Sequence, residues 1–547
     1  MSTQRVRDLS EFVKAYDVRG LVPDQLDAEV ARAIGVAFAR VIAAADGAQS
    51  VVVGHDMRLS SPELSRAFAD GVSSQGLDVV LIGLASTDQL YYASGALDAP
   101  GAMFTASHNP AQYNGIKLCR SGARPVGQDT GLREVREVAQ DLLDGHDSSQ
   151  PQGSVSEPAT ARRVTERDVL ADYATFLRSL VDLSAARPLT VVVDAGNGMA
   201  GHTVPAVLGT AAGLGALPLT VVPLYFELDG SFPNHEANPL EPENLRDLQR
   251  AVVHHGADIG LAFDGDADRC FVVDERGEPV SPSAITALVA AREIAKEVAA
   301  GAKAADVRVV HNVITSRAVP EIVGELGATA VRTRVGHSFI KAEMAAAAAV
   351  FGGEHSAHYY FRDFWFADTG MLAAMHVLAA LGEQSIPLSR LCAAYQRYAA
   401  SGEINSRVAD VEGATARAVA WAQVNGPVQT DTLDGLTVTH PDQPMWWFNV
   451  RASNTEPLLR LNVEAADEST MRWVRDEVLG ILRAPALPGI EGWLRAILRC
   501  PACRGELDDA PGPGGPELVC RAAGCALAYR VEDGIPVLLV DEARRTD

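Results

Sequence analysis

Apolar positions in the first part of the chain fall into two kinds of run. Short β-branched runs predict strands at 50–53, 77–82 and 102–105. Longer stretches with helical periodicity predict helices at 27–45 and 61–74. Because strands and helices alternate, this region is predicted to form a layered sheet with helices on its faces.

The same alternation continues further along the chain. Strands are predicted at 189–193 and 258–263, and the second of these runs directly into an aspartate-rich loop. In open α/β sheets, ligands bind beyond the carboxyl ends of strands, so this loop is a candidate site. The pattern and the linker-like segments predict five domains, with boundaries at 1–160, 161–278, 279–382, 383–486 and 490–547.

Composition narrows the class of protein. The net charge of −23 argues against a general nucleic-acid binder or a protein of anionic membranes. The N-terminus has no signal-peptide pattern, and no run of about 18 apolar residues predicts a membrane span. Seven scattered or clustered cysteines fit a reducing compartment. We therefore expect a cytoplasmic protein with no nucleic-acid or membrane partner.

The run Thr-Ala-Ser-His-Asn-Pro at 105–110 places a serine on a rigid turn. Pro110 fixes its own φ and biases Asn109 away from helix. The turn is predicted to face the surface, with the hydroxyl of Ser107 free to react, whereas His108 is assigned a structural role. A serine is a weak nucleophile on its own and needs a base, a metal or a strong electrophile beside it.

Asp264, Asp266 and Asp268 alternate along one extended segment and can direct three carboxylates at a single point. Oxygen ligands of this kind suit Mg²⁺. An acidic surface loop is the alternative. Part of a calcium loop is a further one, but the glutamate that a calcium hand needs later in the loop is missing.

Three further groups of polar residues are candidates for binding a phosphorylated sugar. Glu354 and Ser356, two positions apart, combine an acceptor and a donor for neighbouring hydroxyls. Tyr16, Arg19 and Arg58 are candidate phosphate contacts near the N-terminus, with solvated surface as the alternative. The last group offers hydrogen-bond donors that suit a phosphate dianion: Arg451, Ser453, Asn454 and Thr455. The alternative for this group is an ordinary polar turn.

Four stretches occur in the order T-A-S-H-N-P, D-G-D-A-D-R, G-E-x-S and R-x-S-N-T-E-P. Over about residues 10–485, the chain resembles the α-D-phosphohexomutase family, in its bacterial phosphomannomutase/phosphoglucomutase branch. The resemblance implies four domains around a central cleft, three mixed α/β and one α+β. It also implies interconversion of hexose 6-phosphate and hexose 1-phosphate, with mannose or glucose as the sugar, through a hexose 1,6-bisphosphate.

The resemblance also assigns roles to residues. Ser107 corresponds to the phosphoserine, which with the three aspartates holds Mg²⁺. Lys117 and His337 are the candidates for proton transfer, and Arg269 supports the phosphoserine or the sugar. Sugar hydroxyls are read by Glu354, Ser356 and His358, while the phosphate that is not transferred binds at Arg451, Ser453, Asn454 and Thr455. Tyr16 and Arg19, candidates from the residues alone, complete the predicted substrate contacts.

Two positions depart from the family pattern. Ala357 stands where the family has glycine, and Ile314 stands where relatives can carry a lysine. Both bear on sugar preference.

Two other functions are alternatives to a phosphomannomutase or phosphoglucomutase. The neighbouring one is a phosphoglucosamine mutase, although that branch usually has glycine at the position of Asn454. A non-catalytic sugar-phosphate-binding protein with a partner-recruiting tail is the other, but the four loops retain their reactive groups.

The C-terminal tail carries four cysteines with gaps of two and four residues: Cys500, Cys503, Cys520 and Cys525. Such spacing favours a tetrahedral structural Zn²⁺ site, with four reduced cysteines in a small β-rich domain as the alternative. Residues 529–538 resemble the end of the Trm112-like family, whose members bind partner proteins. The tail is therefore predicted to be a metal-stabilised β-rich domain that could recruit a protein partner.

Overall fold

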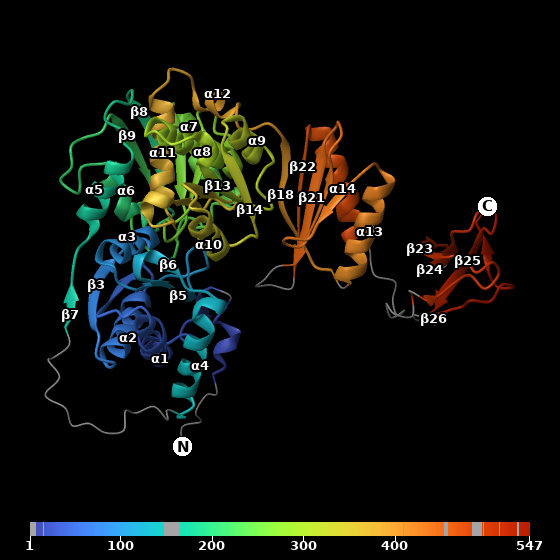
Figure 1. Cartoon of the computed structure of the whole chain (residues 1–547), viewed down its shortest axis with the longest axis horizontal. Coiled ribbons are helices and arrows are strands. Elements are labelled where there is room, and N and C mark those ends of the chain that lie inside the picture. Colours follow the sequence, from blue (N-terminus) through green and yellow to red (C-terminus); the bar gives the residue numbers. More distant parts are fainter. Residues whose placement is uncertain are drawn as a thin grey trace. The chain divides into compact units, whose positions relative to one another are not determined.

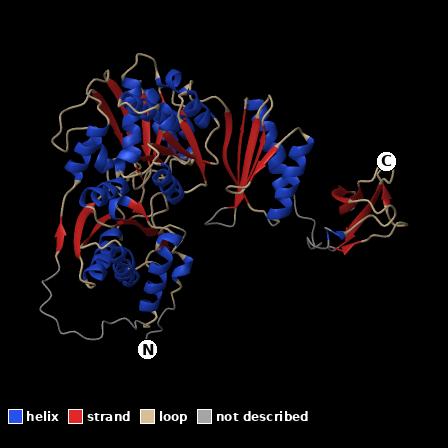
Figure 2. Ribbon diagram, viewed as in Figure 1, coloured by secondary structure: helices blue, strands red, loops and turns tan. Residues whose placement is uncertain are grey.

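The structure is a computed structural model, and the chain forms two compact units, Met1–Tyr398 and Ala399–Asp547, which are described separately. Figures 1 and 2 show the elements of each unit. The structure describes residues 7–14, 16–146, 163–408, 410–452, 458–483, 495, 497–513, 515–532 and 535–546.

The first domain is built on a seven-stranded sheet in the order β1-β5-β4-β2-β3-β7, with β6 beside β5. Its strands are β1 (Val18–Leu21), β2 (Ser50–His55), β3 (Asp78–Leu84), β4 (Gly101–Phe104), β5 (Tyr113–Arg120), β6 (Arg124–Pro125) and β7 (Val164–Glu166). One face packs on α1 (Ala28–Phe38), α2 (Ser61–Ser73) and α4 (Leu132–Leu143), and the other packs on α3 (Thr87–Leu97). The strands and helices predicted for this region are confirmed.

The second domain has the sheet order β12-β11-β10-β8-β9. Strands β8 and β10 are parallel, and β10 then turns back into β11, so the loop between them lies at the carboxyl end of a parallel strand. The elements are β8 (Leu189–Asp194), β9 (Leu219–Leu224), β10 (Ile259–Phe263), β11 (Cys270–Asp274), β12 (Pro279–Val280), α5 (Leu170–Leu180), α6 (Ala200–Val207) and α7 (Arg246–His255).

The third domain repeats the mixed design, with the sheet order β14-β13-β15-β16-β17. Its strands are β13 (Arg308–Asn312), β14 (Thr329–Thr333), β15 (Phe351–Gly353), β16 (Tyr359–Phe361) and β17 (Ala367–Asp368). Its helices are α8 (Pro282–Ala299), α9 (Ala318–Glu325), α10 (His337–Ala347), α11 (Gly370–Gly382) and α12 (Leu388–Cys392). Buried residues of α8 and α11 join those of the second domain in one continuous core, so the two domains are packed together.

Two domain limits differ from the sequence prediction. Strand β7, assigned to the second domain, pairs in parallel with β3 and completes the first sheet. Helix α12, assigned to the fourth domain, buries Leu388, Leu391 and Cys392 in the core shared by the second and third domains. The third domain therefore runs to Tyr398 rather than to residue 382.

The fourth domain begins with strand β18 and is an antiparallel sheet in the order β18-β22-β21-β20-β19. Its elements are β18 (Ala399–Ser406), β19 (Gln429–Asp431), β20 (Leu436–His440), β21 (Trp446–Ala452), β22 (Leu459–Ala465), α13 (Val411–Val424) and α14 (Glu468–Arg483). Both helices cover one face of the sheet (Figure 2). Trp446 and Phe448 are buried in the core of this domain. This is the predicted α+β domain.

The tail is a small β-rich domain, as predicted. Its sheet has the order β23-β24-β25-β26, with β27 beside β25, and a core of few apolar side chains that includes Leu507, Leu518 and Tyr529. The strands are β23 (Leu507–Gly512), β24 (Gly515–Cys520), β25 (Leu527–Glu532), β26 (Ile535–Pro536) and β27 (Arg544–Arg545).

The chain also contains short helical segments: η1 (Leu9–Glu11), the π-helical η2 (Ala39–Ala43), η3 (Ser121–Ala123), η4 (Gln128–Thr130), η5 (Pro242–Leu245), η6 (Ala304–Asp306) and η7 (Arg362–Phe364). Among the residues that the structure describes, none of the helices combines the length and the apolar character needed to cross a membrane.

Candidate active site

Ser107 lies on the turn between β4 and β5, at the end of a buried strand. Its φ of 51° is in the left-handed region, and its backbone N–H donates to Thr105 Oγ1 at 2.8 Å. The side chain is not on a surface-facing turn as predicted, because Ser107 is only 3% exposed. The turn instead points the hydroxyl at a loop of the second domain.

Arg58 holds this turn in place. Its Nε donates to Asp56 Oδ2 at 3.2 Å, and Phe232 of the second domain lies 5.1 Å from the guanidinium. Its two Nη groups donate to four backbone carbonyls of the turn, at distances of 2.7–2.9 Å: those of Ser107, Asn109, Pro110 and Tyr113. All five N–H groups of the guanidinium are therefore used inside the protein. The prediction that Arg58 contacts phosphate is wrong.

We expect Arg58→Lys to lower kcat by about 100-fold, because a displacement of about 1 Å in a catalytic group has effects of this size. Lysine has three donors on one nitrogen and cannot span the four carbonyls. Steady-state kinetics of the purified variant measures this. Arg66→Lys, on the exposed side of α2, is the control and should behave as wild type. A folded Arg58→Lys enzyme with the kcat of the control would refute the positioning role.

The metal loop connects β10 to β11 and meets the serine turn. Ser107 Oγ donates to Asp264 Oδ2 at 2.7 Å, although the two residues are 157 positions apart in sequence. The backbones also touch, because a Cβ on Gly265 would lie 2.4 Å from the carbonyl oxygen of Ser107. Carboxylate oxygens of Asp264, Asp266 and Asp268 lie within 4.8 Å of one another, and all three residues are buried. The two motifs thus form one site.

Cations next to the aspartates balance their charge. Lys117 Nζ donates to Asp266 Oδ2 at 2.7 Å and to Asp268 Oδ2 at 2.5 Å, while Arg269 Nε donates to Asp264 Oδ2 at 2.9 Å. Burial works against the charge of Lys117, but the two carboxylates raise its pKa above the usual value. Burial likewise opposes ionisation of Asp266, yet Lys117 lowers the pKa of Asp266 below its usual value. Burial raises the pKa of Asp264 to about 7, against the effect of Arg269.

The aspartates also present oxygens that fit a divalent cation. In the described part of the chain, Asp266 Oδ1 and Asp268 Oδ1 are buried and have no hydrogen-bond partner. A buried carboxylate oxygen without a partner is costly, and a hard cation such as Mg²⁺ accepts this type of ligand. The donor set therefore fits the predicted metal.

The sugar loop follows β15 and contacts the metal loop. Ser356 Oγ donates to Glu354 Oε2 at 3.3 Å and lies 3.1 Å from His358 Nδ1. His358 forms an isolated antiparallel β-bridge with Arg269, and its Nε2 lies 3.7 Å from Asp268 Oδ1. Ala357, at the family's glycine position, has a φ of 65° and is buried. The predicted readers of sugar hydroxyls thus lie beside the predicted metal ligands.

Three other predicted residues lie in the same unit. Arg19 donates through Nη1 to Asn109 Oδ1 of the serine turn at 2.5 Å. The ring of Tyr16 packs edge-on against that of His337, with centroids 4.5 Å apart. Burial, assisted by the charge of Lys341, lowers the pKa of His337 to about 3, so its imidazole is neutral at physiological pH.

The fourth predicted loop lies in the second unit. Arg451, near the end of β21, is buried and donates through Nη2 to Glu403 Oε2 at 2.7 Å. Ser453, Asn454 and Thr455 lie outside the described residues. The structure therefore brings together three of the four predicted loops, and the contribution of the fourth loop to the same site stays a prediction.

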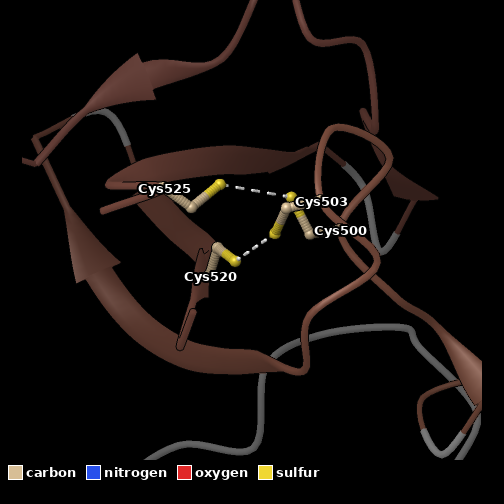
Figure 3. Close-up of side chains that lie close together, drawn as sticks. All are labelled: Cys500, Cys503, Cys520 and Cys525. Atoms are coloured by element: carbon tan, nitrogen blue, oxygen red, sulfur yellow. Dashed lines mark hydrogen bonds between the residues drawn. The ribbon is translucent and has the colours of Figure 1, made fainter. Parts of the chain in front are cut away.

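The four tail cysteines also converge, as Figure 3 shows. Their sulfurs lie within 4.8 Å of one another, with 3.7 Å between Cys500 and Cys525 and 3.3 Å between Cys503 and Cys520. Zn–S bonds of about 2.3 Å in a tetrahedron place sulfurs about 3.8 Å apart, close to this arrangement. Against burial, the hydroxyl of Tyr529, 3.2 Å from Cys500 Sγ, helps lower the pKa of Cys500 to about 6.

Sequence reasoning missed the start of α3. Thr87 Oγ1 donates to Asp266 Oδ2 at 2.6 Å, and the neighbouring Asp88 is fully buried. The available signal was position, because this segment follows the predicted strand 77–82 and so lies where strand-end rules place functional residues. Lys341 and Asp368, an ion pair at 2.6 Å in the third domain, were also missed, and neither belongs to a recognisable motif.

Comparisons with known proteins cover most of the chain. Residues 10–142, 171–277 and 282–398 match models of the phosphoglucomutase/phosphomannomutase alpha/beta/alpha domains I, II and III, and residues 403–481 match the C-terminal domain of the same group. A protein of Xanthomonas campestris pv. campestris named "Phosphohexose mutases" is 41% identical over 474 residues, which are 86% of this chain and 98% of that protein.

Two more similarities agree with this one. A phosphomannomutase of Escherichia coli is 38% identical over 474 residues, again 86% of this chain and 98% of that protein. The crystal structure of a phosphoglucomutase/phosphomannomutase family protein from Burkholderia thailandensis superposes with a TM-score of 0.74 at 30% identity. It covers 87% of this chain and 98% of that one. The matched domain models end before the cysteine-bearing tail.

Proposed function

Because the chain belongs to the phosphoglucomutase/phosphomannomutase family, we propose that Ser107 carries the phosphoryl group that is exchanged with mannose phosphates and glucose phosphates. The enzyme is a phosphohexomutase, which interconverts hexose 6-phosphate and hexose 1-phosphate. The observation that carries the role of Ser107 is its hydrogen bond to Asp264, inside a cluster of three buried carboxylates.

The reaction needs two phosphoryl transfers. In the first, the bond between phosphorus and Ser107 Oγ breaks while a bond forms to a free hydroxyl of the hexose monophosphate, giving a 1,6-bisphosphate. In the second, the other phosphate of that intermediate returns to Ser107 Oγ. Arg58 keeps the serine turn rigid during both transfers, and Arg269 supplies positive charge beside Ser107.

Sugar binding is assigned to the third domain. Glu354, whose Oε1 accepts a hydrogen bond from Tyr360 Oη at 2.7 Å, is assigned to accept hydrogen bonds from sugar hydroxyls. Ser356 and His358 complete the set. We assign the transfer of the attacking hydroxyl's proton to Lys117 or His337. We assign the phosphate that is not transferred to Arg451, together with Ser453, Asn454 and Thr455. Arg19 and Tyr16 contact the substrate from the first domain.

We assign a Mg²⁺ ion to Asp264, Asp266, Asp268 and the phosphorylated Ser107. Bound there, it would neutralise charge on the phosphoryl group during transfer. The unpartnered oxygens of Asp266 and Asp268 support this assignment, and Lys117 balances the negative charge of the same two carboxylates.

A coupled assay with mannose 1-phosphate, glucose 1-phosphate and glucosamine 1-phosphate tests the substrate class. We expect turnover of the mannose and glucose compounds to exceed that of glucosamine 1-phosphate by at least about 100-fold, since the glucosamine branch usually has glycine where this chain has Asn454. Preference for glucosamine 1-phosphate would favour the neighbouring branch. No turnover of any compound, even with glucose 1,6-bisphosphate present, would favour a non-catalytic binding protein.

For the tail we propose a structural Zn²⁺ on Cys500, Cys503, Cys520 and Cys525 and a binding role toward a protein partner. The converging sulfurs support the metal. Apolar side chains exposed near the C-terminus support the partner, with Ile535 at 69%, Leu539 at 50% and Val540 at 47%. If this surface binds a protein, Leu539→Asp should abolish its chemical cross-linking to that partner without changing mutase activity.

A further inference from the structure

Asp88 is a fully buried carboxylate that receives hydrogen bonds from all three domains of the first unit. It lies in the first turn of α3, in the first domain. Tyr173 Oη, on α5 of the second domain, donates to Asp88 Oδ2 at 2.6 Å. Thr369 Oγ1, at the start of α11 in the third domain, donates to the same oxygen at 2.7 Å. Ser86 Oγ donates to Oδ1. One side chain thus joins three domains.

The donors around Asp88 are themselves fixed. Ser86 is the N-cap of α3, and its Oγ accepts from Gln89 N–H. Thr369 is the N-cap of α11, and its Oγ1 accepts from Leu372 N–H at 3.1 Å. Asp88 therefore ties together the starts of two helices that belong to different domains. A shift of either helix would break a hydrogen bond to a buried carboxylate, which is costly.

The hydrogen-bond network of Asp88 reaches the metal loop through the preceding residue, Thr87. Thr87 N–H donates to the carbonyl of Asp266 at 3.0 Å, and Thr87 Oγ1 donates to Asp266 Oδ2 at 2.6 Å. Since Thr87 precedes Asp88 in the same helical turn, the position of Asp88 sets where these two donors lie. One predicted metal ligand is thus held from the first domain.

The hydrogen-bond network of Asp88 also reaches the sugar loop, through Thr369. Thr369 N–H donates to the carbonyl of Tyr359 at 3.0 Å, and β17, which ends at Asp368, pairs with β16. Strand β16 directly follows His358, and Tyr360 within it donates to Glu354 Oε1 at 2.7 Å. The carboxylate of Asp88 is therefore separated from the sugar loop by one strand pair.

We propose that Asp88 is a positioning residue that fixes the spacing between the metal loop of the second domain and the sugar loop of the third. It acts through Thr87 on one side and Thr369 on the other and does not touch the substrate. The proposal rests on the proposed function, which assigns the metal to Asp266 and the sugar to Glu354.

Asp88→Ala removes the oxygen that accepts hydrogen bonds from both Tyr173 and Thr369, whereas Asp88→Asn keeps an oxygen that can accept them. We expect Asp88→Ala to raise both the KM for hexose phosphate and the Mg²⁺ concentration for half-maximal activity by about 10-fold or more, with a smaller change in kcat. Asp88→Asn should restore both constants to within about 3-fold of wild type, because its amide oxygen still accepts from Tyr173 and Thr369. Asp98→Asn, at the exposed left-handed C-cap of the same helix, is the control.

Hydrogen exchange gives a readout that does not depend on turnover. Amides of residues 264–269 and 354–358 should exchange faster in Asp88→Ala than in wild type, and the double variant with Tyr173→Phe should be no worse than Asp88→Ala alone. If Asp88→Ala does not fold, Tyr173→Phe decides the question by the same two constants, with a smaller expected rise.

Unchanged constants in the folded variant, or a loss of thermal stability with unchanged exchange in both loops, would overturn the proposal and leave Asp88 a purely structural residue. If the wild-type chain shows no mutase activity, the proposed function fails, while the exchange measurement still tests the coupling of the two loops.

Discussion

Replacing Ser107 with alanine is expected to lower kcat by about 10⁴-fold or more, because removal of the group that forms the covalent intermediate eliminates the step itself. The fold should persist, since the turn is held by backbone contacts that alanine retains. Its N–H still donates to Thr105, and its carbonyl still accepts from Arg58. The variant loses the hydrogen bond from the Ser107 hydroxyl to Asp264 and the contact of that hydroxyl with His108.

Two measurements check this result. Intact-protein mass after incubation with glucose 1,6-bisphosphate should show a phosphoryl group on the wild type and none on Ser107→Ala. Thermal unfolding should show two proteins of similar stability. Ser74→Ala, at the end of α2, removes a hydroxyl that donates to the carbonyl of Gly71 and accepts from the side-chain amide of Gln75, and it should keep the wild-type kcat. Near wild-type turnover in Ser107→Ala would end the assignment of the nucleophile.

The meeting of the serine and the aspartates could be predicted from the sequence because both follow predicted strands. Strand β4 ends just before Thr105, and β10 ends just before Asp264, so both motifs lie where ligand sites form in α/β sheets. The four-domain architecture was implied by the resemblance to the α-D-phosphohexomutase family, which rests on the four motifs and their order along the chain. Local pattern was enough for the first conclusion only.

Contacts between segments that are far apart in the chain could not be predicted from the sequence. Arg58 was taken for a phosphate contact, but its partners are carbonyls of a turn whose shape sequence alone does not give. Asp88 looked like an ordinary residue at a helix start, and its importance depends on Tyr173 and Thr369, which are far away in sequence. Burial of Ser107 has the same origin, because the second domain covers the turn through Gly265.

Two domain limits were predicted incorrectly for a related reason. Residues 164–166 form a strand only because the edge of β3 accepts them, and every one of these three residues is exposed, so their pattern carries no hydrophobic signal. Helix α12 has a clear apolar face, but the sequence does not say which core receives it. Assignment to one domain or another is decided by packing, and packing is not a local property.

Replacing Cys500 with serine is expected to abolish the Zn²⁺ binding that we propose for the tail and to unfold the tail. The described core of this domain is small, including Leu507, Leu518, Tyr529 and Val531 with two of the cysteines, and so cannot offset the chain's conformational entropy alone. A structural zinc site contributes on the order of 10 kcal/mol to folding. Loss of one of four thiolates should remove most of this stabilisation, while the kcat of the mutase stays near wild type.

Metal analysis of the purified chain should find about one zinc per molecule, and none in Cys500→Ser. Two further variants separate loss of a ligand from a packing effect. Cys500→His keeps a zinc-binding atom and should retain part of the metal. Tyr529→Phe removes only the hydroxyl that contacts Cys500 Sγ, so the metal should stay with lower affinity. If Cys500→Ser kept a fully folded tail without metal, shown by dispersed amide resonances of residues 507–532, the apolar core would be sufficient and the zinc would have no structural role.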